Sequence, residues 1–206
     1  MTTSDATSPE VLDALLELVT IGVGRGAAGL SELTGREVGI SVPTLEIFDF
    51  EQSHPSDQFQ GASLRVRQSF DGGITGHALF VLNVEGAHRV AELLLGGTGN
   101  HDAFDDNEQA ALLELGNIII GGVVSQLVNQ IGESVNWELP QLQLRGSAGL
   151  VDMVSDLADP RGMRVILMRA TLSLESENVS GYLMLVLSDE HLSELMEKLE
   201  HMLALV

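Results

Sequence analysis

The chain repeats itself once, and this internal repeat constrains the fold more than any other feature of the sequence. Three segments of the first half recur in the second half in the same order. The aligned pairs are 13–24 with 110–121, 38–47 with 135–144, and 74–83 with 179–188. The offset is 97 positions for the first two pairs and 105 for the third, so eight extra residues are expected in the second half, within 146–160.

Each half predicts a helix, three strands and a closing helix, from helical or alternating apolar spacing and from turn residues. The predicted helices are 9–34, 84–95, 107–132 and 189–203, and the predicted strands are 38–48, 62–70, 74–82, 135–145, 163–174 and 179–187. The first strand of each half contains a proline, Pro43 or Pro140, and proline lacks the N–H that a central strand needs. We therefore expect these two strands at an edge or a bulge. Asn83 and Ser188 are expected to cap the closing helices.

This pattern predicts an α+β fold in which two pseudo-twofold αβββα repeats share one β-sheet, with two long helices packed on it. A half with three strands would leave a sheet edge open, which favours one shared sheet. We expect a single domain over residues 1–206, with repeats at about 9–96 and 107–205 and a linker at 97–106. A monomer is favoured.

Composition excludes several classes of function. The chain of 206 residues has 30 acidic and 10 basic residues, and 4% of it is aromatic, so it lacks the positive field and stacking surface that nucleic acids require. It has no cysteine, which excludes disulfides and thiolate chemistry and indicates the cytoplasm. Glycines interrupt the longest apolar runs, so no membrane insertion is expected. The single lysine among ten basic residues suits either a high-salt cytoplasm or a GC-biased composition.

One face of the helix at 107–132 carries an unusual set of residues. Glu114, Asn117 and Gly121 are spaced to lie on one stripe, as are Asp13, Glu17, Thr20 and Gly24 in the first copy. Glycine inside a helix costs about 1 kcal/mol relative to alanine, so Gly121 and Gly122 require a reason, and small residues allow another backbone to approach closely. The alternative is an ordinary solvated face on which the two glycines serve helix packing.

The motif Glu-x-x-Asn followed 23 residues after the asparagine by proline, with two copies in about two hundred residues, resembles the CheC family of chemotaxis phosphatases. The resemblance covers nearly the whole chain. It implies a hydrolase that removes the aspartyl phosphate from a CheY-like response-regulator receiver domain. Glu114 would form an ion pair with a lysine of the receiver, and Asn117 would orient the water molecule that attacks the phosphate. No cofactor of its own is implied, since magnesium is expected in the receiver, and the receptor deamidase CheD is a possible second partner.

Two departures from the family pattern bear on activity. The family has Asp or Ser four residues before the glutamate, where the second copy has Ala110. The first copy keeps Asp13 and Glu17 but has Thr20 in place of the asparagine, and a hydroxyl cannot present two separated polar groups as an amide does. The second copy is therefore expected to be the working site and the first a degenerate site. The rival function is a non-catalytic binding module, as in a flagellar switch or a CheD partner.

Other motifs are weaker. The run at 24–29 matches G-x-G-x-x-G, but it lies inside a helical pattern rather than after a strand. The six histidines show no ligand spacing and are expected at the surface, and no metal site is expected. Asp102, Asp105 and Asp106 lack the spacing of a calcium loop, so a solvated turn is expected there.

Overall fold

Four helices and seven strands are assigned within the described part of a computed structural model, residues 8–49, 61–97, 103–146, 154, 157, 162–174 and 177–204. The helices are α1 (Pro9–Thr34), α2 (Val84–Leu95), α3 (Asp106–Gln130) and α5 (Asp189–Leu203). The strands are β1 (Val38–Asp49), β2 (Ser63–Gly72), β3 (Gly76–Asn83), β4 (Val135–Trp137), β5 (Gln141–Arg145), β6 (Met163–Leu174) and β7 (Glu177–Ser188). Half of the predicted linker (98–102), and most of the segment predicted to hold the eight extra residues, lies outside the described residues.

The helix starts follow the sequence signals for capping. Asn83 and Ser188 cap α2 and α5, accepting hydrogen bonds from the backbone N–H groups of Gly86 and His191, as predicted. Asp105 caps α3 in a capping box with Glu108, so α3 begins one residue before the predicted start.

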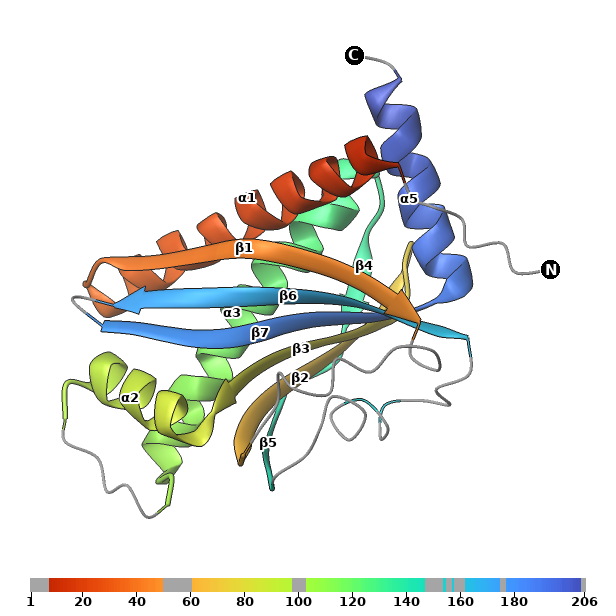
Figure 1. Ribbon diagram of the computed structural model, residues 1–206. Coiled ribbons are helices and arrows are strands. Elements are labelled where there is room, and N and C mark those ends of the chain that lie inside the picture. The colour runs from red at the N-terminus through yellow and green to blue at the C-terminus, as the bar shows by residue number, and fades with distance from the viewer. Residues whose placement is uncertain are drawn as a thin grey trace.

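The described strands form one antiparallel sheet in the order β1-β6-β7-β3-β2-β4, with β5 also paired to β2. The long helices α1 and α3 lie on the same face of this sheet (Figure 1). The predicted α+β class and the single shared sheet are confirmed. The order of elements is compatible with the predicted repeat, since β7 and β3 meet at the centre and the two proline-containing segments lie at opposite edges.

One strand prediction is wrong. The second proline segment was expected to be a continuous strand over 135–145, but it forms two short strands interrupted at 138–140. Proline offers no N–H for the ladder, and at the interruption Gln68 of β2 instead donates its side-chain amide to the carbonyl of Glu138. In β1 the register shifts between Ser41 and Thr44, beside Pro43, and the strand continues. Both prolines thus lie in edge segments, as predicted.

The main core lies between the sheet and the helices. Within the described residues, α3 is long and apolar enough by composition to span a membrane, although glycines interrupt its apolar runs. In this fold 56% of that candidate stretch is buried inside the protein, as expected of a core helix.

The two long helices cross with their backbones almost in contact. A Cβ added to Gly22 of α1 would lie 2.7 Å from the carbonyl oxygen of Gly122, and a Cβ added to Gly122 of α3 would lie 2.5 Å from that of Gly22. Real Cβ atoms do not approach backbone atoms so closely. This crossing therefore requires glycine at both positions, and it fixes how α3 is presented to solvent.

Candidate functional site

The polar stripe predicted on α3 lies on the side of the helix that faces away from α1. The α1 crossing involves Gly122, Ile118 and Ile119 of α3, whereas Asn117 lies about 140° around the helix from Gly122. Glu114 is exposed and Asn117 is partly exposed. The side-chain amide of Asn117 donates a long hydrogen bond, 3.5 Å, to Oε2 of Glu114. The two groups therefore lie together at the surface, and the Asn117 amide is not held in the core.

The two adjacent glycines of α3 have different environments. Gly122 is the residue at the close crossing with α1, whereas a Cβ added to Gly121 would meet nothing within 4 Å. The interpretation that both glycines serve helix packing therefore holds only for Gly122. Gly121 instead leaves the surface next to Asn117 without a side chain, so a partner can approach the backbone there.

The equivalent stripe on α1 is also exposed. Asp13, Glu17 and Thr20 all lie at the surface, and Gly24 likewise borders open space. The Thr20 hydroxyl donates a 2.8 Å hydrogen bond to the carbonyl of Leu16 one turn earlier. The hydroxyl is thereby held against the helix backbone, which separates this stripe chemically from the one that carries Asn117.

The acidic residues before α3 have a structural role. Asp105 accepts hydrogen bonds from the backbone N–H groups of Asn107 and Glu108, and Asp106 is the first residue of the helix. Asp102 lies outside the described residues. A search of the described segments finds no group of three His, Asp or Glu side chains arranged to hold a metal ion.

The glycine motif at 24–29 lies inside α1 and directly follows helical residues, so it cannot form a dinucleotide loop, which joins a strand to a helix. The expectation that the histidines lie at the surface is wrong for His88. Its side chain is buried and stacks on Phe104, with ring centroids 3.8 Å apart and an interplanar angle of 8°. No sequence pattern indicates this contact, because Phe104 lies in the predicted linker.

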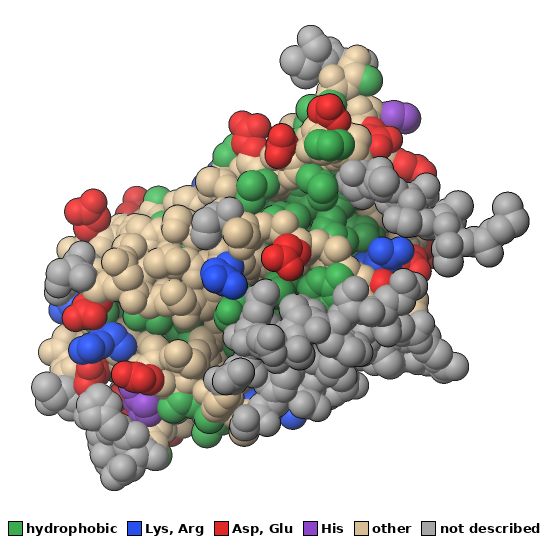
Figure 2. Space-filling model, viewed as in Figure 1, with side chains coloured by type: hydrophobic (Ala, Val, Ile, Leu, Met, Phe, Trp, Pro, Cys, Tyr) green, Lys and Arg blue, Asp and Glu red, His purple; other side chains and the backbone are tan. Residues whose placement is uncertain are grey.

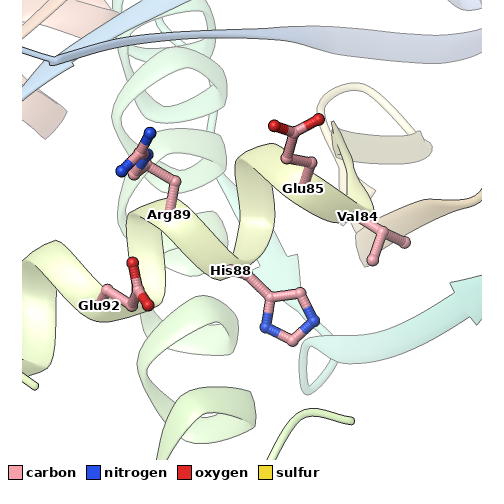
Figure 3. A pocket seen from close by; sticks show the side chains of 5 residues that line it. All are labelled: Val84, Glu85, His88, Arg89 and Glu92. Atoms are coloured by element: carbon pink, nitrogen blue, oxygen red, sulfur yellow. The ribbon is translucent and has the colours of Figure 1, made fainter. Parts of the chain in front are cut away.

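A hollow of about 630 Å³ lies along α2 and was not predicted. Glu85, Arg89 and Glu92 line it with charges of both signs, and His88 points to the other side of the helix from Glu85 and Arg89 (Figure 3). Arg89 lies 3.8 Å from Glu177 of β7. This mixture of charges favours no single class of ligand, so the α3 stripe is the stronger candidate site.

The surface around these features is acidic overall, with a formal net charge of -20. Figure 2 shows acidic side chains on the face in view, several of them near α1 and α5. An exposed Asn beside an exposed Glu has no nucleophile or metal of its own. It can orient a water molecule, hold a cationic group and contact a phosphoryl oxygen, provided that the reacting group and its metal arrive with a partner.

Comparison with known proteins supports this assignment of the motif. The chain is 29% identical over 153 residues to the putative CheY-P phosphatase CheC1 of Halobacterium salinarum, covering 72% of this chain and 75% of that protein. It is 28% identical over 142 residues to the CheY-P phosphatase CheC of Bacillus subtilis, covering 66% of each chain. No protein-family model matches the chain.

The fold is also that of a solved relative. The structure of Thermotoga maritima FliY matches 95% of this chain and 98% of its own chain, with a TM-score of 0.75 and 21% sequence identity. At this identity the likeness establishes the architecture alone, and the similarity to CheC proteins comes from the sequence relatives. The repeated motif and these relatives together show that the chain is similar to the CheC family of chemotaxis phosphatases.

Proposed function

We propose that this protein is a phosphatase that accelerates hydrolysis of the aspartyl phosphate on a CheY-like receiver domain in chemotaxis signalling. The observation that carries the proposal is the pair of surface side chains Glu114 and Asn117, 3.5 Å apart on an open helix face beside the bare backbone of Gly121. The sequence relatives named CheY-P phosphatases support the same chemistry.

Asn117 is proposed to position the attacking water. Its side chain carries one acceptor oxygen and an amide with two N–H donors, so it can hold a water molecule while donating to a phosphoryl oxygen. Hydrolysis of an acyl phosphate needs an in-line water and charge stabilisation more than covalent help. The receiver is proposed to supply the magnesium ion and a lysine, so this chain needs no cofactor of its own.

Glu114 is proposed to hold the receiver in place. An exposed carboxylate one helical turn before Asn117 can pair with a lysine of the partner while the amide enters the partner's active site. The long hydrogen bond from Asn117 to Glu114 aligns the amide before the partner arrives and breaks at little cost, because both groups remain in contact with water.

The first stripe is proposed to be a degenerate copy. Asp13 and Glu17 preserve its acidic surface, but the Thr20 hydroxyl is bonded to its own helix and reaches less far than an amide. This stripe can bind a receiver without orienting water.

The second candidate activity is binding of the receptor deamidase CheD. We also propose that the protein acts in the cytoplasm.

The direct test is phosphate release from a phosphorylated receiver with magnesium, with and without purified protein. Asn117→Ala is expected to reduce the accelerated rate on the order of a hundredfold, the typical loss when a reactant is misplaced. Asn129→Ala is the matched control, because Asn129 is an exposed asparagine near the end of the same helix. Wild-type protein that binds the receiver without releasing phosphate would favour the non-catalytic binding module.

A further inference from the structure

Three large apolar side chains are exposed along one edge of the sheet. Trp137 at the end of β4 is 37% exposed, Leu139 in the connection that follows is 86% exposed, and Leu144 in β5 is 62% exposed. Within the described strands, β4 and β5 each pair only with β2, so no other described strand covers this edge. Open edges with apolar side chains are rare unless a partner uses them.

These side chains flank the polar stripe of α3. A Cβ added to Gly116 of α3 would meet the side chain of Val66 of β2, and Val66 is paired with Leu142 of β5. Helix α3 thus sits over β2, with α1 on one side and the β4–β5 edge on the other. Asn117 faces away from α1 and therefore toward this edge.

Trp137 and Leu144 are on the same side of the sheet as α3. The Trp137 ring lies 5.9 Å from that of Phe70, which belongs to the core under the helices. Leu144 is two residues from Leu142, which packs against that core, and alternate residues of a strand share a face. Trp137 and Leu144 therefore lie on the face of the sheet that carries α3, beyond the side of α3 to which Asn117 points, and Leu139 lies between them along the chain.

The other half of the molecule lacks this apolar edge. At the offset of 97 positions, Leu139 corresponds to Val42, which is 6% exposed, and Leu144 corresponds to Ile47, which is only partly exposed. The more exposed apolar edge residues thus lie in the half that carries Asn117, and their less exposed counterparts lie in the half that carries Thr20. The second half therefore has both the amide side chain and the more exposed apolar edge, and the first half has neither.

We propose that Leu139 and Leu144, with Trp137 behind them, form the apolar part of the docking surface that seats the phosphorylated receiver over Asn117. This inference rests on the proposed function, and it assigns to these apolar side chains the recognition of the receiver at that site. The phosphoryl group and this chain are both negatively charged, so their long-range interaction is repulsive. Apolar contact supplies affinity that does not depend on charge, and it leaves Glu114 to fix the orientation.

The test is steady-state dephosphorylation of a CheY receiver by wild type and by Leu139→Ser and Leu144→Ser. Each variant is expected to raise KM roughly tenfold with unchanged kcat, because burial of a leucine contributes to ground state and transition state alike. Both side chains are exposed, so neither change removes core packing. Leu33→Ser is the matched control, because Leu33 is 65% exposed in the last turn of α1, and its KM should equal that of wild type.

Affinity for the receiver activated with beryllofluoride and magnesium is measured in parallel, to separate docking from catalysis. Unchanged KM and affinity in both leucine variants, with an active wild type, would overturn the docking inference alone. An inactive wild type whose receiver affinity still falls in the leucine variants would overturn the phosphatase and support the docking surface. No binding by wild type would overturn both.

Discussion

The crossing of the two long helices predicts opposite effects for two adjacent glycines. In Gly122→Ala the new Cβ would lie 2.5 Å from the carbonyl oxygen of Gly22, and ordinary contacts begin at 3.4 Å. The obstructing atoms belong to a helix backbone and cannot rotate away. The helices must therefore separate by up to about 1 Å, which disturbs the core that both helices cover.

The expected size follows from two opposing terms. Overpacking of a core typically costs about 1–3 kcal/mol, whereas alanine is favoured over glycine in a helix by about 1 kcal/mol. The two terms together should lower the free energy of unfolding of Gly122→Ala by up to about 2 kcal/mol, or its Tm by up to roughly 8 °C for a domain of this size. Gly121→Ala meets nothing within 4 Å and should raise the free energy of unfolding by about 1 kcal/mol.

Urea unfolding followed by far-ultraviolet circular dichroism measures both variants against wild type. Since Gly121 borders the polar stripe, its alanine variant should also bind the receiver more weakly while unfolding at higher urea. A gain in stability of about 1 kcal/mol for Gly122→Ala, as expected for Gly121→Ala, would refute the close crossing, and a loss of stability in Gly121→Ala would refute the open face.

Three further predictions follow from individual contacts. Thr20→Asn should raise the phosphatase rate per protein by up to about twofold if the first stripe fails only for want of an amide, and no gain in a folded variant would show that this stripe does not dock the receiver. Nζ of Lys198, the single lysine, lies 2.6 Å from Oε1 of Glu133, and both side chains are about a third exposed. Lys198→Met should therefore lower the free energy of unfolding, measured in urea, by at most about 1 kcal/mol, and by less at high salt. Asp105→Ala removes the cap of α3 and should lower the free energy of unfolding by about 1 kcal/mol, whereas Asp105→Asn should retain most of it.

The repeat made most of the architecture predictable. Element boundaries such as those of α1, α2, β6 and α5 agree with the sequence patterns because caps, glycines and apolar periodicity all coincide there. The split of the second edge segment was not predictable in the same way. Pro43 and Pro140 occupy equivalent positions, yet one strand continues through a register shift and the other is interrupted.

The candidate site was only partly predictable. Helical spacing alone placed Glu114 and Asn117 on one face, since they lie within the same helix. The spacing could not show which of the two adjacent glycines the helix crossing requires. That depends on where α1 contacts α3, and the contacting residues are far apart in the sequence. The exposed Leu139 and Leu144 were likewise hidden, because apolar residues in a predicted strand are normally assigned to the core.

The most direct test of the account is a comparison of steady-state constants for Asn117→Ala and Glu114→Gln acting on the phosphorylated receiver. Glu114 is proposed to bind ground state and transition state alike, so Glu114→Gln should mainly raise KM and should show a shallower dependence of affinity on salt. Asn117 is proposed to act on the reacting water, so Asn117→Ala should mainly lower kcat, by about a hundredfold. Unchanged kcat in Asn117→Ala would contradict the central claim that this amide performs the chemistry.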